Sequence, residues 1–268
     1  MLENFKTKLR EHQSPEKKYS VLREELQLIV LSIISSRGYF KNISFLGGTA
    51  LRILYQIQRY SEDLDFSLYK KDSYDFEEMM TTIVRELNLR NLNVDVKLKR
   101  SVGTVRSCFL RFTNLLFELG LSPLKDQKIS IKFEVDENPP MGFNTELTLI
   151  PRNQNFTISN FDKPTLYAGK LNAILCRQYT KGRDFFDLLW FLAEHSEINI
   201  EFLNNGMEQQ LNGNFNLDKT AIKKSLLEKI QASDFIKIRE DLRPFIFDEK
   251  SLEFYTKENF SSQVDRFF

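Results

Sequence analysis

The sequence is poor in cysteine and histidine, with two of each among its 268 residues. So few cysteines do not make a disulfide framework, and Cys108 and Cys176 lie in apolar surroundings that predict free core thiols. A zinc site of the usual cysteine and histidine kind is not expected. Any metal bound here would be held by oxygen ligands, which points to magnesium or manganese.

Long apolar runs are also missing. The longest, residues 26–34, contains Gln27 and Ser32, and it fits a buried helix better than a membrane span. The first residues are polar and charged, without the apolar core of a secretory signal. We therefore predict a cytoplasmic protein that does not engage a membrane. The net charge of +1 does not by itself indicate a nucleic-acid binder.

The apolar spacing predicts an α+β fold in which strands come first and helices gather later. Strands are predicted at residues 43–46, 63–69, 93–100, 104–112, 128–136 and 145–150. Helices are predicted at residues 16–37, 75–90, 164–178, 183–194, 218–231, 233–241 and 248–265, and a further helix follows the glycines after the first strand. The Asn-rich stretch 153–160 is predicted to be a loop. We expect a core with an N-terminal helix over residues 1–155 and a helical domain over 156–268 packed on it.

A Gly-Gly-Thr turn joins the first predicted strand to the helix that follows it. Gly47 and Gly48 lack Cβ atoms, so a ligand can approach their backbone closely. The N–H groups at the start of the helix and the Thr49 hydroxyl form a suitable site for phosphate. Taken alone, this pattern is more often only a turn.

Two aspartates, Asp63 and Asp65, follow on the next predicted strand. Residues i and i+2 of a strand point to the same face, where two carboxylates repel each other. A divalent cation bound between them removes that repulsion. The alternative is an exposed polar face, but the preceding strand, glycine turn and helix favour a metal site.

A third acid is expected from the alternating segment 128–136. Its apolar residues occupy one face, and Glu134 and Asp136 lie on the other with Ser130 and Lys132. Pairing with the Asp63–Asp65 strand would bring one of the two acids to the metal. We favour Glu134, which is nearer the middle of the strand, while an ordinary solvent face remains the alternative.

At this point the sequence resembles a known family, on two blocks. The first reads FLGGTALR over residues 45–52 and RYSEDLDF over 59–66, and the second reads KLNAIL over 170–175 and KGRDFFDL over 181–188. Both are similar to the signature of the AbiEii/AbiGii toxin nucleotidyltransferases, within the polymerase-beta-like superfamily. The resemblance implies a polymerase-beta-like nucleotidyltransferase core with a mixed sheet, followed by a helical C-terminal region.

The resemblance also implies roles for individual residues. Asp63 and Asp65 would hold Mg²⁺, with Mn²⁺ possible, and would be catalytic. Gly47, Gly48, Thr49 and Arg52 would bind the nucleotide's phosphates. Lys170 would contact the triphosphate as a point charge and act in catalysis. Asp184 and Asp187 share a helical face. Asp187 would be catalytic and Asp184 would bind the nucleotide, or the two would hold Lys170 or Arg183 in an ion-pair network.

The activity implied is transfer of a nucleoside monophosphate from an NTP to an acceptor. The acceptor expected for the family is RNA, especially the tRNA 3′ end, although a protein or small-molecule hydroxyl is an alternative. A binding module without transfer, or a toxin that sequesters GTP, are further alternatives. The resemblance also implies a cognate antitoxin and a place in toxin–antitoxin or phage-defence systems.

Ser61, grouped with the nucleotide-binding residues, lies two residues before Asp63. If the strand began there, its hydroxyl would share the face of both aspartates. A phosphate on Ser61 would then compete with the incoming triphosphate. The alternative is that Ser61 only caps the turn before the strand.

Overall fold

The computed structural model describes residues 1–12, 14–99, 103–152 and 154–268. The chain forms two compact units, and neither is continuous in sequence. The first contains Met1–Ala50, Tyr60–Pro139 and Leu147–Asn160, and the second contains Leu51–Arg59, Pro140–Glu146 and Phe161–Phe268. The division predicted after residue 155 is a single cut, whereas these units interleave.

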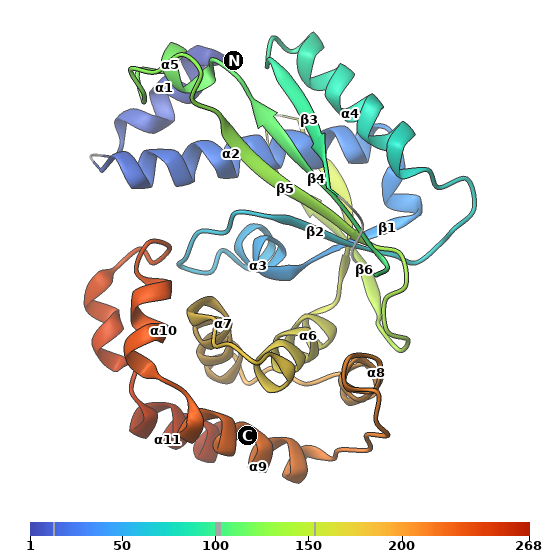
Figure 1. Ribbon diagram of the computed structural model, residues 1–268, viewed down its shortest axis with the longest axis vertical. Coiled ribbons are helices and arrows are strands. Elements are labelled where there is room, and N and C mark those ends of the chain that lie inside the picture. Colours follow the sequence, from blue (N-terminus) through green and yellow to red (C-terminus); the bar gives the residue numbers. More distant parts are fainter. Residues whose placement is uncertain (13, 100–102, 153) are drawn as a thin grey trace. The chain divides into compact units, whose positions relative to one another are not determined.

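A mixed seven-stranded sheet provides the frame of the first unit (Figure 1). Its strands are β1 (Ile43–Leu46), β2 (Leu64–Leu68), β3 (Val94–Leu98), β4 (Val105–Phe112), β5 (Ile129–Asp136), β6 (Thr145–Ile150) and β7 (Phe156–Phe161). The order across the sheet is β3-β4-β5-β2-β1-β7-β6. β2 pairs antiparallel with β1 and parallel with β5, so it lies near the centre of the sheet.

The helices of the first unit are α1 (Leu2–Arg10), α2 (Pro15–Ser36), η1 (Tyr39–Lys41), α4 (Phe76–Leu89) and α5 (Leu115–Glu118). Ser14 caps α2 by accepting a hydrogen bond from the Lys17 N–H, and Pro15 occupies the first turn, where its missing N–H costs nothing. α2 packs against β5. The apolar residues of β5 are buried and alternate with half-buried polar residues, so one face of this strand belongs to the core.

Helices dominate the second unit. They are α6 (Lys163–Cys176), α7 (Gly182–Ala193), α8 (Ile200–Leu211), α9 (Lys219–Ala232), α10 (Phe235–Leu242), η2 (Glu249–Phe254) and α11 (Lys257–Phe267). α6 packs against α7, α8 and α9, and α7 also packs against α10 and α11. The helix α3 (Gly47–Tyr55) begins in the first unit and ends in the second. Within the described chain, every helix is too short or too polar to cross a membrane.

The α+β class is confirmed, with corrections. The predicted loop at 153–160 is wrong, because residues 156–161 form β7, which pairs parallel with β1. Ser159 and Asn160 are polar but buried within β7, and their polarity is the reason that the sequence predicted a loop here. The helix predicted over 248–265 is interrupted at Tyr255 and Thr256, where Thr256 caps a new helix. The helices α1 and α8 were not predicted, and Arg100, the predicted end of the third strand, lies outside the described residues.

Candidate functional site

The turn between β1 and α3 places glycine backbone directly against an aspartate. Gly47 has a φ of +81°, in the left-handed region that favours glycine. A Cβ added to Gly47 would lie 2.6 Å from Oδ2 of Asp65. The carboxylate of Asp65 therefore occupies the space that a side chain at position 47 would need.

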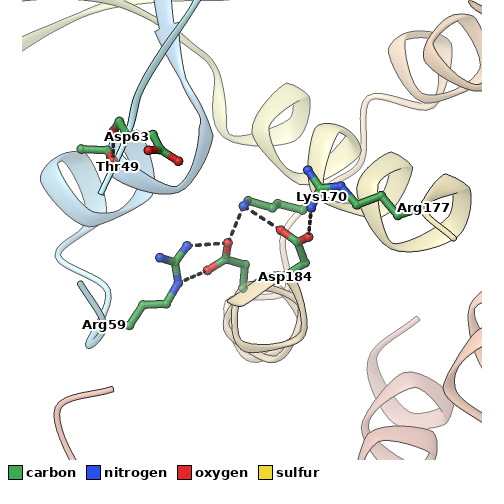
Figure 2. A network of polar contacts seen from close by, with 7 residues as sticks. Thr49, Arg59, Asp63, Lys170, Arg177 and Asp184 are labelled. Carbon is green, nitrogen blue, oxygen red and sulfur yellow. Dashed lines mark hydrogen bonds and ion pairs between the residues drawn. The ribbon is translucent and has the colours of Figure 1, made fainter. Parts of the chain in front are cut away.

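Thr49, in the first turn of α3, is fully buried. Its hydroxyl donates a hydrogen bond to the backbone carbonyl of Asp63, and Figure 2 shows the two residues side by side. This contact ties the start of α3 to the residue that precedes β2. The hydroxyl thus positions the site, and binding of phosphate by Gly47, Gly48 and Thr49 stays a prediction.

Asp65 and Glu134 are register partners on the adjacent parallel strands β2 and β5. Both side chains are half-buried, whereas Leu64 and Phe66, on either side of Asp65, are buried in the core. Asp63 lies one residue before β2, because the strand begins at Leu64 and not at the predicted residue 63. The register places two of the three predicted acids next to each other.

Asp136, the alternative third acid, is the register partner of Ser67, one position beyond Val135 and Phe66. Its carboxylate accepts hydrogen bonds from the Thr104 hydroxyl, at 2.9 Å, and from the Asn138 N–H, at 3.0 Å. These bonds occupy the carboxylate of Asp136 at the end of β5. The register pairs Glu134 with Asp65 and therefore favours Glu134 as the third acid.

Lys132, which the sequence analysis did not single out, contacts the carboxylate of Glu134 in an ion pair. Burial alone would lower the pKa of Lys132, but the hydrogen bond and charge of Glu134, with the charges of Asp63 and Asp65, outweigh it and raise that pKa. The ammonium group therefore lies within the electrostatic reach of all three predicted metal ligands. The alternating pattern of β5 already placed Lys132 on the face of Glu134.

The donor chemistry of Asp63, Asp65 and Glu134 suits a hard divalent cation such as Mg²⁺, which prefers carboxylate oxygens. Glu134 already binds one cation, the ammonium of Lys132. Over the described ranges, no three Asp, Glu, His or Cys side chains are arranged so that together they could hold a metal ion. The chemistry fits a metal, but the third carboxylate is turned to the lysine and a complete ligand set is not pre-arranged.

A second group of charged residues lies inside the second unit, on α6, α7 and the segment before β2. Arg59 and Asp187 are 1% and 0% exposed. The guanidinium of Arg59 donates two hydrogen bonds to Asp187, from Nε and from a terminal nitrogen, both at 2.7 Å. The ammonium of Lys170 lies 2.8 Å from the same carboxylate. Asp187 is therefore a fully buried carboxylate that is paired with two cations.

Asp184, one turn before Asp187 on α7, extends this group (Figure 2). Its carboxylate binds Lys170 at 3.1 Å and also Arg177. Burial alone would raise the pKa of Asp184, but the charges of Lys170 and Arg177 lower it. Conversely, burial would lower the pKa of Lys170, and the carboxylates of Asp187 and Asp184 raise it. These contacts are those of the ion-pair network that the sequence left as an alternative, and Arg59 and Arg177 are further members of it.

Arg52 and Ser61, the remaining predicted site residues, contact other residues of the protein. The guanidinium of Arg52 donates to the carbonyl of Ile57 at 2.8 Å and lies 4.7 Å from the centre of the Phe247 ring. Ser61 lies outside any strand, and its carbonyl accepts a hydrogen bond from Gln27 at 3.2 Å. Because β2 begins only at Leu64, the strand geometry that would align Ser61 with both aspartates is not present. The nucleotide-binding roles of Arg52 and Ser61 stay predictions.

Comparison with known families gives a match over most of the chain. A family model described as "Nucleotidyl transferase AbiEii toxin, Type IV TA system" matches residues 29–264. The match includes the β1–α3 turn, Asp63 and Asp65, and the charged network of α6 and α7. A search of curated proteins finds no match to this sequence.

Solved structures show a similar fold at low sequence identity. JHP933 from Helicobacter pylori is 18% identical, with a TM-score of 0.54 over 92% of this chain and 91% of that one. MenT4, described as the nucleotidyltransferase toxin Rv2826c from Mycobacterium tuberculosis H37Rv, is 16% identical, with a TM-score of 0.56 over 99% of this chain and 90% of that one. At such identities the likeness establishes the fold alone.

Proposed function

The chain belongs to the AbiEii nucleotidyltransferase toxin family, and from that premise we propose that it transfers a nucleoside monophosphate from an NTP to RNA, with the 3′ end of tRNA as acceptor. The observation that carries the proposal is the pairing of Asp65 with Glu134 beside Gly47. This arrangement puts the carboxylate of Asp65 next to the N-terminus of α3, with Glu134 on the adjacent strand. Carboxylates for a metal and a helix N-terminus for a phosphate are the two elements that phosphoryl-group chemistry needs.

Each residue then has a defined task. Mg²⁺ held by Asp63, Asp65 and Glu134, or Mn²⁺ in its place, would supply the positive charge that neutralises the triphosphate and activates the attacking hydroxyl. Gly47 leaves room for the carboxylate of Asp65, and Thr49 fixes the backbone of Asp63. The N–H groups of Gly48 and Thr49 are offered to a phosphate. Released pyrophosphate leaves as the second product.

The biological role proposed with this activity is that of the toxin of a toxin–antitoxin or phage-defence pair, restrained by a cognate antitoxin in the cytoplasm. The catalytic roles of Lys170 and Asp187 and the nucleotide-binding role of Asp184 stay predictions that rest on the family resemblance. Their contacts within the second unit support the role of a buried structural network.

The test uses the purified chain with each NTP, Mg²⁺ and total RNA or tRNA. Label in the α-phosphate is expected to appear in RNA, whereas label in the γ-phosphate is not, because it leaves with pyrophosphate. Asp65→Asn, or EDTA added to the wild type, is expected to abolish incorporation. Asp136→Asn is the matched control, because it removes a carboxylate from the same strand as Glu134.

Other outcomes distinguish the alternatives. Label that persists in protein after nuclease treatment identifies a protein acceptor, and label in a small molecule identifies that class. NTP binding without incorporation into any acceptor indicates sequestration. Incorporation that is unchanged in both Asp63→Asn and Asp65→Asn contradicts the metal site.

A further inference from the structure

Lys132 lies on strand β5, in contact with one of the predicted metal ligands, Glu134. It lies on β5 two residues before Glu134, on the same face, and its side chain is 29% exposed. Glu134 is the register partner of Asp65, and Lys132 precedes the Phe133–Leu64 pair by one residue, at the end of β2 that Asp63 precedes. The charges of Asp63 and Asp65 both act on the ammonium of Lys132.

Lys128 provides an internal comparison, because it belongs to the same alternating face of this segment. Its ammonium pairs with Asp95 at 3.1 Å, away from the predicted metal ligands. The ammonium of Lys132 instead contacts Glu134 within its own strand. Two lysines on one face thus have different partners, and only Lys132 meets a predicted metal ligand.

We propose that Lys132 is an internal counter-ion of the carboxylate group, which holds Glu134 in the metal-free protein and must be displaced from it when a divalent cation binds. The inference rests on the proposed metal-dependent function. It makes Lys132 a positioning residue, because it acts on the metal through Glu134. One ammonium group and one divalent cation then compete for the same oxygen atoms, so Lys132 sets the metal concentration that the protein needs.

The consequence is a linkage between the lysine and the metal. Metal binding must first break the Lys132–Glu134 pair, and the energy needed offsets part of the free energy that the metal gains from Glu134. The charge of the displaced ammonium also repels the metal ion. Replacing Lys132 by a neutral side chain of similar length removes both costs. The metal is therefore expected to bind more tightly to Lys132→Met than to the wild type.

The experiment measures Mn²⁺ affinity without NTP, from the loss of the electron paramagnetic resonance signal of unbound Mn²⁺. Lys132→Met is expected to lower the Kd by roughly three- to tenfold, the range for a partly exposed ion pair with added charge repulsion. Lys132→Arg keeps the charge and is expected to stay near wild type. Lys128→Met removes the same charge from the same face and is expected to leave the Kd unchanged. Thermal unfolding in EDTA checks that each variant is folded.

The outcomes separate this inference from the proposed function. If the wild type binds Mn²⁺ and Asp65→Asn does not, the metal site stands, and an unchanged or raised Kd in Lys132→Met then overturns the counter-ion role alone. An unchanged Mn²⁺ affinity with weaker NTP binding would make Lys132 a nucleotide contact, which also contradicts the inference. Absence of Mn²⁺ binding in both the wild type and Lys132→Met overturns the metal site and the inference together.

Discussion

The carboxylates of the two units differ in their burial and in the cations that contact them. Asp184 and Asp187 are almost fully buried, and basic side chains contact both of them directly. Asp65 and Glu134 are half-buried on the sheet, and the cation that contacts Glu134 is a partly exposed lysine. A buried carboxylate must keep its partner at all times, since an isolated charge in the interior is very costly. A half-buried one can exchange its partner for a cation from solution.

The largest expected effect is a loss of stability when a buried carboxylate of the second unit is neutralised. Asp187→Asn removes the charge that faces Arg59 and Lys170, and we expect it to lower the free energy of unfolding by about 3–5 kcal/mol. Chemical denaturation followed by circular dichroism measures the loss. Glu194→Gln is the control, because its pair with Lys163 is exposed and is expected to contribute less than about 1 kcal/mol. Equal losses in the two variants would show that the network does not stabilise the second unit.

The opposite behaviour is expected on the sheet. Asp65→Asn removes a predicted metal ligand, so nucleotide transfer is expected to fall by roughly 100- to 1000-fold. The melting temperature is expected to stay constant or rise slightly, because repulsion between Asp63 and Asp65 is relieved. Transfer assays and thermal unfolding of the same preparation give both values. A large loss of stability with normal transfer would show that Asp65 has a structural role and is not a metal ligand.

A substitution in the glycine turn tests whether the position of the Asp65 carboxylate matters for transfer. Ala at position 47 would place a Cβ 2.6 Å from the Asp65 carboxylate and force it to move. Gly47→Ala is expected to reduce transfer by at least about tenfold, because small displacements of catalytic groups are costly. Gly38→Ala is a matched control, since Gly38 also has a positive φ, of +73°, but has nothing within 4 Å of the added atom. Both variants share the backbone strain, and equal transfer rates would exclude the displacement of Asp65.

Patterns within one strand or one turn could be predicted from the sequence. The alternation of residues 128–136 located both the buried face of β5 and the acids on its other face. The spacing of Asp63 and Asp65 after the glycines located the candidate metal ligands. These features depend only on residues that are close in sequence, and they can therefore be recognised from the sequence pattern.

Features that depend on distant partners could not be predicted. The sequence gives no sign that Arg59 is buried against Asp187, because the two residues are 128 positions apart. Likewise, Asn160 reads as a loop residue, and only its place in β7 beside β1 explains its burial. Lys132 was on the predicted polar face, but its role depends on which acids the neighbouring strand brings to it.

The smallest effect concerns Arg177 at the edge of the buried network. Its side chain is 31% exposed, so its pair with Asp184 is screened by solvent, and Arg177→Gln is expected to cost only about 1 kcal/mol at pH 7. Arg177 and Lys170 lower the pKa of Asp184 against the effect of burial. A carboxylate with a lowered pKa contributes stability above its unfolded pKa, of about 4, and that stability is lost as the pH falls through the folded value.

The cost of Arg177→Gln should therefore depend on pH in a defined direction. It is expected to be constant from about pH 5 upward. It is expected to shrink as the pH falls below about 4 toward the lowered pKa of folded Asp184, because the protonated side chain no longer attracts the guanidinium. Urea unfolding of the wild type and the variant at several pH values measures this difference directly. Arg243→Gln, which removes an exposed pair with Glu249, is the control and is expected to change stability little at any pH. A cost that persists unchanged down to the lowest pH at which both proteins still fold would mean that Arg177 stabilises the second unit by packing and not through the charge of Asp184.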